Sequence, residues 1–207
     1  FYYYHNSDQF IWGSEIKAIK AGNNLITQID NKSLDQYLNY GHTLSSSSIY
    51  NNIKKLLPGH YFFIEPLKSK EIKIKKYWDI KINKGSKSFE EYREELLYEL
   101  KESVKMRMIS DVPLGAFLSG GVDSSSVVSL MCELSSKPIK TFSIGFKEEK
   151  FNELKYAKIL SNKYKTDHHE FIIEPDSIDN LSKIVNMFGE PLADSSIIPT
   201  YFLSKYT

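Results

Sequence analysis

The residues of this chain whose types and spacing best suit chemistry lie in one short run, Ser-Gly-Gly-Val-Asp-Ser-Ser at positions 119–125. Two adjacent glycines let a backbone turn sharply and approach a ligand closely, because no Cβ stands in the way. The run opens a stretch with the residue pattern of a helix. The first N–H groups of a helix lack partners and carry the positive end of its dipole. The run therefore predicts an anion site.

The side chains of the run indicate which anion it binds. Ser119, Ser124 and Ser125 would add hydroxyl donors for several phosphate oxygens, and Asp123 suits a Mg²⁺ ion that bridges phosphates. The predicted ligand is a nucleotide polyphosphate, with Ser119 and Asp123 nearest to the chemistry and Asp123 as the metal ligand. We expect both Gly120 and Gly121 to be needed. A methyl group at Gly121 would block the approach of a phosphate or force a strained φ.

Three widespread loops of related type do not fit the run. A Walker loop ends in Gly-Lys-Ser/Thr, and no lysine occurs between Lys105 and Lys137. The dinucleotide loop needs spaced glycines, and a nucleophile elbow would need glycine in place of Phe117. The remaining pattern, Ser-Gly-Gly-x-Asp-Ser, resembles the PP-loop of ATP pyrophosphatases, which cleave ATP between its α and β phosphates. The alternative is an ordinary glycine turn before a capped helix.

Composition describes an ordinary globular chain. Its 207 residues suffice for one or two domains with a core, and 41% are hydrophobic and 26% charged. A net charge of +1 gives no reason to expect a nucleic-acid partner, and no apolar run is long enough to span a membrane. The single cysteine, Cys132, excludes an intramolecular disulfide and suits a reducing compartment. We therefore expect a cytoplasmic protein.

The first 82 residues have the pattern of short strands and helices. Residues 2–12 predict a hairpin that turns at residues 6–8, and residues 33–39 predict a helix with Ser33 as its N-cap. Residues 61–64 and the lysine-rich stretch 71–82 predict two further strands. The polar residues 83–88 that follow predict a linker.

The remaining residues, 89–207, have a different pattern. Ser88 would cap a helix that extends to about Ile109. Strands and helices then alternate: strand 116–119, helix 124–134, strand 141–146, helix 152–163, strand 169–173 and helix 177–188. This alternation predicts an α/β domain with a doubly wound parallel sheet. Such sheets bind ligands at the carboxyl ends of their strands, where the glycine run falls.

Longer stretches resemble one family, glutamine-dependent asparagine synthetase of the B type. In the second part the resemblance is carried by residues 111–125, 141–146, 168–170 and 190–200. In the first part, residues 1–17 are similar to the closing strands of the family's glutaminase domain, and residues 57–60 and 77–78 resemble the segment that joins its two domains.

The resemblance implies an internal piece of a two-domain enzyme. Residues 1–82 would be the α+β C-terminal remnant of an N-terminal-nucleophile glutaminase domain with its connector. Residues 89–207 would be the first part of a PP-loop domain of the adenine nucleotide alpha hydrolase-like type. The glutaminase nucleophile and glutamine pocket would precede Phe1, and a second nucleotide and metal loop would follow Thr207.

The activity implied is the ATP-dependent amidation of aspartate to asparagine. It would proceed through β-aspartyl-AMP, release AMP and pyrophosphate, and take its ammonia from glutamine. ATP and Mg²⁺ would be required, the partners would be small molecules, and a homodimer is left open. The implied site residues are Ser119, Gly120, Gly121, Ser124 and Ser125 for pyrophosphate, Asp123 for Mg²⁺, Phe117 and Leu118 near the adenosine, the Ile144 backbone for adenine, and Glu190, Asp194 and Ser195 for aspartate.

Two alternative functions stay open at this point. One is a β-lactam synthetase or another asparagine-synthetase-like amidotransferase that acts on a different carboxylate. The other is a nucleotide-binding protein without catalysis. The loop is common to all of these, so the sequence alone leaves the acceptor undetermined.

Overall fold

The computed structural model of the chain describes residues 1–22, 27–64, 72–82, 84–148, 152–173 and 181–207. They form two compact units. The first unit comprises Phe1–Asn83 and Asn180–Ser195, and the second comprises Lys84–Asp179 and Ser196–Thr207. Residues 180–195 thus group with the first unit, although in sequence they follow most of the second.

The first unit is built on an antiparallel sheet of order β2-β1-β3. Strands β1 (Tyr2–His5) and β2 (Phe10–Gly13) form the predicted hairpin, and β3 (Ile53–Lys55) pairs with the other edge of β1. The turn is closed by Asn6, whose Oδ1 accepts the N–H groups of Asp8 and Gln9. Helix α1 (Ile16–Ala21) packs on this sheet, and its isoleucines join Tyr4 and Ile53 in the core.

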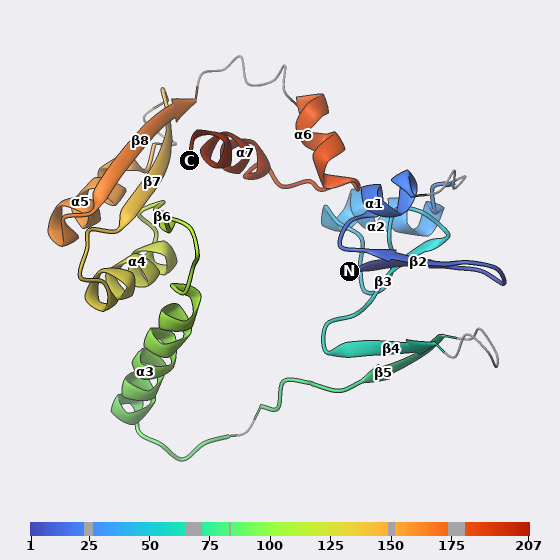
Figure 1. Ribbon diagram of the computed structural model, residues 1–207, viewed down its shortest axis with the longest axis horizontal. Coiled ribbons are helices and arrows are strands. Elements are labelled where there is room, and N and C mark those ends of the chain that lie inside the picture. Colours follow the sequence, from blue (N-terminus) through green and yellow to red (C-terminus); the bar gives the residue numbers. More distant parts are fainter. Residues whose placement is uncertain (23–26, 65–71, 83, 149–151, 174–180) are drawn as a thin grey trace. The chain divides into compact units, whose positions relative to one another are not determined.

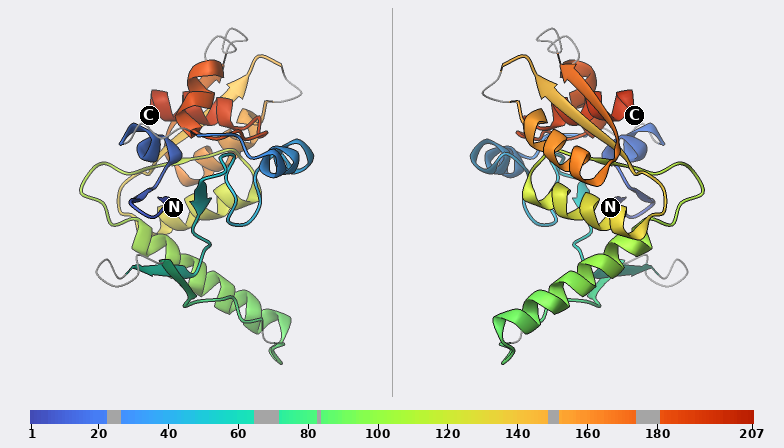
Figure 2. Two further views of the ribbon diagram at one scale, coloured as in Figure 1. Left: turned by 90° about the vertical axis from the view of Figure 1, so that its right-hand side faces the viewer. Right: turned by 90° about the vertical axis from the view of Figure 1, so that its left-hand side faces the viewer.

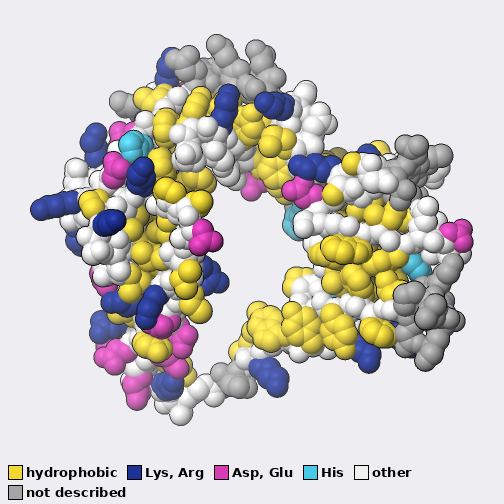
Figure 3. Space-filling model, in the orientation of Figure 1, with side chains coloured by type: hydrophobic (Ala, Val, Ile, Leu, Met, Phe, Trp, Pro, Cys, Tyr) yellow, Lys and Arg dark blue, Asp and Glu magenta, His cyan; other side chains and the backbone are white. Residues whose placement is uncertain are grey.

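Helix α2 (Asn31–Tyr40) corrects one prediction. Its N-cap is Asp30, whose carboxylate accepts the Ser33 N–H at 2.9 Å, so Ser33 lies within the first turn. Strands β4 (His60–Ile64) and β5 (Ile72–Lys76) form a separate antiparallel hairpin, over which apolar side chains gather in Figure 3. Helix α6 (Leu181–Phe188) completes the unit.

The second unit contains the predicted parallel sheet. Its strands β6 (Gly115–Phe117), β7 (Lys140–Phe146) and β8 (Asp167–Ile173) lie in the order β6-β7-β8. Helices α4 (Val122–Leu134) and α5 (Leu154–Tyr164) connect successive strands. Helix α3 (Phe89–Arg107) precedes them and begins with a capping box between Ser88 and Glu91, which confirms Ser88 as its cap.

Helices cover both faces of this sheet (Figures 1 and 2). On one face α5 packs so closely that a Cβ at Gly145 would lie 2.5 Å from Leu154 Cδ1. On the other face lies α7 (Ile197–Tyr206), whose Tyr206 ring stacks on Phe171 of β8 at 5.1 Å between centroids. The α/β fold with helices on two faces is therefore confirmed, whereas α7 was not expected from the sequence. Within the described ranges no helix is long and apolar enough to cross a membrane.

Candidate phosphate-binding site

The glycine loop joins β6 to α4 and leaves the sheet from a rigid anchor. The Leu118 N–H donates to Phe142 O at 2.9 Å, and the Ser143 hydroxyl donates to Leu118 O. The Leu118 side chain is only 1% exposed and packs with Val128 and Ala157 in the core. Leu118 thus holds the loop in place, and its predicted contact with adenosine stays a prediction.

Hydrogen bonds within the loop preorganise it. The hydroxyls of Ser119 and Ser124 lie 2.9 Å apart, and the Gly121 N–H donates to Ser119 Oγ at 3.2 Å. The Ser124 hydroxyl also donates to Gly121 O at 3.2 Å. Because these bonds fix the turn before any ligand arrives, binding a phosphate would need little ordering of the backbone.

The two glycines have different conformations. Gly120 has φ +84°, which side chains rarely tolerate, and a Cβ there would lie 2.6 Å from Tyr156 Cβ and 2.7 Å from the Ala157 N. Gly121 has φ −69° and ψ 161°, an ordinary conformation, and the nearest atom to an added Cβ is Ser119 Oγ at 3.3 Å. The prediction of a strained φ at Gly121 is therefore wrong, because the left-handed conformation occurs at Gly120. For Gly121 the remaining reason to need glycine is the room that it leaves for a phosphate.

Helix α4 begins at Val122, two residues earlier than predicted, so Asp123 lies in its first turn. The N-cap is Gly121, and no side chain caps the helix. The Ser125 N–H already donates to Gly121 O within the helix, so this N–H does not serve a ligand. The part of Ser125 proposed to bind a ligand is its side-chain hydroxyl. An uncapped helix terminus beside an open glycine is suited to an anion, because the first-turn N–H groups have no partners in the helix.

Asp123 is exposed on this first turn. Among the described residues, no three or more His, Cys, Asp or Glu side chains are grouped to hold a metal ion. The described protein side chains alone would therefore not make a metal site here. The donor set does fit Mg²⁺ shared with phosphate oxygens, since this ion is commonly bound through one or two carboxylates plus substrate phosphates.

Two residues next to the loop were predicted to meet the nucleoside. Phe117 is 46% exposed at the end of β6 and lines a cavity of about 270 Å³ together with Pro113, Leu114, Gly115, Lys140, Phe142 and Thr207. The Phe142 carbonyl of β7 points toward β6, where it accepts the Leu118 N–H. Because backbone groups two residues apart in a strand point to the same side, the N–H and C=O of Ile144 also point toward the β6 side. Ile144 lies beyond Phe117–Phe142, the last residue pair between the two strands. That placement suits the contact with adenine predicted for Ile144.

The three residues predicted for the aspartate pocket lie in the first unit, whereas the loop lies in the second. Glu190 accepts a hydrogen bond from Tyr2 Oη and pairs with Lys55, each at 2.7 Å. Asp194 and Ser195 follow on the same segment and are exposed. The structure therefore commits the Glu190 carboxylate to protein partners, a role that its sequence context did not indicate.

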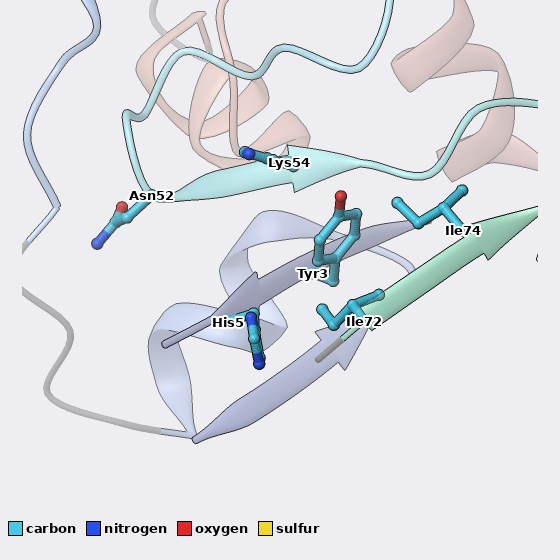
Figure 4. A pocket seen from close by; sticks show the side chains of 6 residues that line it. All are labelled: Tyr3, His5, Asn52, Lys54, Ile72 and Ile74. Atoms are coloured by element: carbon cyan, nitrogen blue, oxygen red, sulfur yellow. The ribbon is translucent and has the colours of Figure 1, made fainter. Parts of the chain in front are cut away.

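A separate cavity in the first unit holds none of the predicted site residues. It measures about 350 Å³ and is lined by Tyr3, His5, Asn52, Lys54, Ile72 and Ile74, between the β1–β3 sheet and β5 (Figure 4). In the second unit, Cys132 is a free thiol on α4 whose pKa burial raises. Neither feature contributes to the phosphate site.

The fold and the loop together define an α/β protein of the PP-loop class. The chain belongs to the asparagine synthase family, because the family model with the description "Asparagine synthase" matches residues 95–207. A second model, "Glutamine amidotransferase domain", matches residues 1–78. The resemblance found in the sequence is thus confirmed over both parts of the chain.

Two named relatives match nearly the whole chain. It is 39% identical to "Putative asparagine synthetase [glutamine-hydrolyzing] 2" of Methanocaldococcus jannaschii, over 99% of this chain and 40% of the relative. It is 35% identical to "Asparagine synthetase [glutamine-hydrolyzing] 1" of Bacillus subtilis, over 99% of this chain and 32% of the relative. The chain thus spans between about a third and two fifths of the length of these relatives. Among solved structures, the NMN synthetase of Francisella tularensis is similar with a TM-score of 0.37 and 18% identity, over 58% of this chain and 50% of that one, which is too distant to carry an argument.

Proposed function

We propose that this chain is part of an enzyme that converts aspartate to asparagine with ATP and with ammonia taken from glutamine. The observation that carries the proposal is the preformed loop at residues 119–125, which opens onto an uncapped helix terminus in a chain of the asparagine synthase family. The match of residues 1–78 to a glutamine amidotransferase domain supports glutamine as the source of ammonia.

The chemistry requires activation because a carboxylate is a poor electrophile. An oxygen of the aspartate β-carboxylate attacks the α-phosphorus of ATP, the bond to the β-phosphate breaks, and pyrophosphate leaves. Ammonia then attacks the acyl carbon of β-aspartyl-AMP, AMP departs, and the nitrogen loses a proton to give the amide. The protein's main task in the first half is to stabilise the charge of the departing pyrophosphate.

The residues of the loop have the properties that this task needs. First-turn N–H groups of α4 and the Ser125 hydroxyl would donate to the phosphate oxygens. The hydroxyls of Ser119 and Ser124 would join them by turning from their bonds within the loop toward the ligand. Gly121 leaves room for the approach of the phosphate oxygens: among the described residues other than its chain neighbours, the nearest atom to a Cβ there is Ser119 Oγ at 3.3 Å. Mg²⁺, when bound through Asp123, would supply further positive charge at the same oxygens.

The acceptor is the least constrained part of the proposal. Asp194 and Ser195 are proposed to recognise aspartate, as the family resemblance implies. A β-lactam synthetase or another amidotransferase would bind a different carboxylate with the same loop, and a nucleotide-binding protein without catalysis would bind ATP and release nothing. We further propose a cytoplasmic enzyme with small-molecule substrates only.

The test is the exchange of labelled pyrophosphate into ATP, measured with the complete protein in the presence and absence of aspartate. We expect exchange that depends on aspartate and on Mg²⁺. Exchange with other carboxylates but not with aspartate would favour the other amidotransferases, and ATP binding without any exchange would favour the non-catalytic alternative. Asp123→Asn should lower this exchange. Its matched control is Glu133→Gln at the opposite end of α4, because Glu133 is exposed and its carboxylate pairs with Lys101 of helix α3.

A further inference from the structure

Three polar side chains, those of Tyr2, Thr43 and Lys55, form a cluster around the Glu190 carboxylate in the first unit. Tyr2 Oη donates to its Oε1 at 2.7 Å, Lys55 Nζ lies 2.7 Å from the same oxygen, and Thr43 Oγ1 donates to Oε2 at 3.3 Å. Lys55 also donates to Thr43 Oγ1 at 2.6 Å. The Lys55 and Glu190 side chains are only 22% and 15% exposed. Both charges therefore depend on each other and on these hydrogen bonds, since few waters reach them.

The members of this cluster come from the two parts of the chain that match different family models. Tyr2, Thr43 and Lys55 lie within the match to the glutamine amidotransferase domain, whereas Glu190 lies within the match to asparagine synthase. The latter residue is separated from Tyr2 by 188 positions. The cluster thus attaches a segment of the synthase sequence to the amidotransferase sequence within one compact unit.

Two further bonds hold the same segment. The Ala193 N–H donates to Gly41 O at 2.9 Å, and Lys17 Nζ donates to Met187 O at 3.0 Å. Among the described residues, the segment from Met187 to Ala193 is therefore held by these two bonds and by the Glu190 cluster, which contains a mostly buried ion pair. Loss of one charge there would leave its partner uncompensated, which is costly for a group with little access to water.

We propose that Lys55 and Glu190 are positioning residues. Their ion pair fixes the segment that carries Asp194 and Ser195 on residues 1–78, the part that matches the amidotransferase domain. This attachment couples the use of glutamine-derived ammonia to the synthesis of asparagine. The inference rests on the proposed function, because it assigns the coupling of that same reaction to a pair of residues. Neither residue needs to touch a reacting atom for this role.

The experiment compares the complete wild-type protein with Lys55→Met, Lys55→Arg and the control Lys87→Met. Lys87 forms an ion pair of similar length, with 2.6 Å between its Nζ and Glu95 Oε2. In that pair, however, the side chains of both residues are about half exposed. Asparagine formed per glutamine hydrolysed is measured together with asparagine formed from added ammonium chloride. For Lys55→Met we expect the glutamine ratio to fall about 3- to 10-fold while synthesis from ammonium changes less than twofold. Lys55→Arg, which keeps the charge, should restore most of the ratio, and Lys87→Met should match the wild type.

A second measurement tests the attachment without reference to activity. Hydrogen exchange of the Ala193 amide, which is bonded to Gly41 O, should become faster in Lys55→Met and stay unchanged in Lys87→Met. Should Lys55→Met fail to fold, Glu190→Gln serves instead, since an amide oxygen still accepts from Tyr2 while the charge is lost.

The outcomes separate the two proposals. If the wild type makes no asparagine from aspartate with either nitrogen source, the proposed function fails. If the wild type does so but Lys55→Met keeps its ratio, the inference is overturned. An equal loss from glutamine and from ammonium, with no recovery in Lys55→Arg, would likewise overturn it, because that result describes a general loss of structure.

Discussion

Replacing each loop glycine by alanine separates the contribution of the loop to stability from its contribution to phosphate binding. At Gly120, with φ +84°, alanine would adopt a left-handed conformation that costs about 1–2 kcal/mol. Its Cβ would also meet Tyr156 Cβ at 2.6 Å and Ala157 N at 2.7 Å. Those atoms belong to the start of α5 and move only with the helix, so overpacking adds about 1–3 kcal/mol. We expect Gly120→Ala to lower the free energy of unfolding of the second unit by about 2–5 kcal/mol.

At Gly121 the same methyl group would cost little stability. The φ of −69° suits alanine, which restricts the unfolded chain and stabilises by about 0.4–1 kcal/mol. Alanine is also a poorer N-cap than glycine, which costs a similar amount, so the two effects nearly cancel. Catalysis should respond differently, because the methyl group projects toward the space proposed for the phosphates. Displacing one preorganised donor typically lowers turnover by about 10²-fold, and we expect a loss of that order in pyrophosphate exchange.

The assay combines urea unfolding, followed by intrinsic fluorescence, with aspartate-dependent exchange of pyrophosphate into ATP. Gly120→Ala should be destabilised, and Gly121→Ala should be close to the wild type in stability but nearly inactive. Two results would refute the reasoning: normal exchange by Gly121→Ala, or a Gly120→Ala protein as stable as the wild type. The first would mean that the loop does not hold phosphates, and the second that the left-handed residue is not where the structure places it.

Four further predictions rest on single features. Asp123→Asn should lower exchange and raise the Mg²⁺ concentration needed for half-maximal rate, with an unchanged unfolding midpoint; an unaltered Mg²⁺ dependence would contradict the role as metal ligand. Ser88→Ala removes the hydroxyl of a capping box and should destabilise α3 by about 1 kcal/mol, measured by urea unfolding against Ser126→Ala as control. Burial raises the pKa of the Cys132 thiol, so it should react with a disulfide reagent at pH 8 more slowly than a free cysteine does; a faster reaction would show an accessible thiolate. Burial and the bond to Glu190 raise the pKa of Tyr2 above its ordinary value of about 10, so its contribution to stability is complete below pH 10 and is lost as the pH rises toward the folded pKa; Tyr2→Phe should flatten the alkaline limb of the stability curve, and an identical limb would contradict this.

Features set by neighbouring residues were predictable from the sequence. The hairpin at residues 2–12, the helix cap at Ser88 and the alternation of strands and helices after it depend on contacts within a few positions, and the structure confirms them. The loop itself also belongs to this group, since adjacent glycines and the following serines restrict the backbone locally. Two local predictions failed by small shifts. Asp30 competes better than Ser33 for the first-turn N–H groups of α2, and α4 starts at Val122 because Gly121 serves as its N-cap.

The tertiary structure decided what depends on distant residues. Which glycine is strained follows from where α5 approaches the loop, 36 positions beyond Gly120 at Tyr156, and no local pattern contains that contact. Glu190 meets Tyr2 and Thr43 across 188 and 147 positions, so its neighbours in sequence, which suggested an aspartate ligand, say nothing about its buried partner Lys55. The sequence by itself determined the kind of loop and the family. The loop depends on the conformational preferences of adjacent residues, and the family match depends on the order of residues along the chain. The environment of each charge depends on packing between distant segments, which only the folded chain establishes.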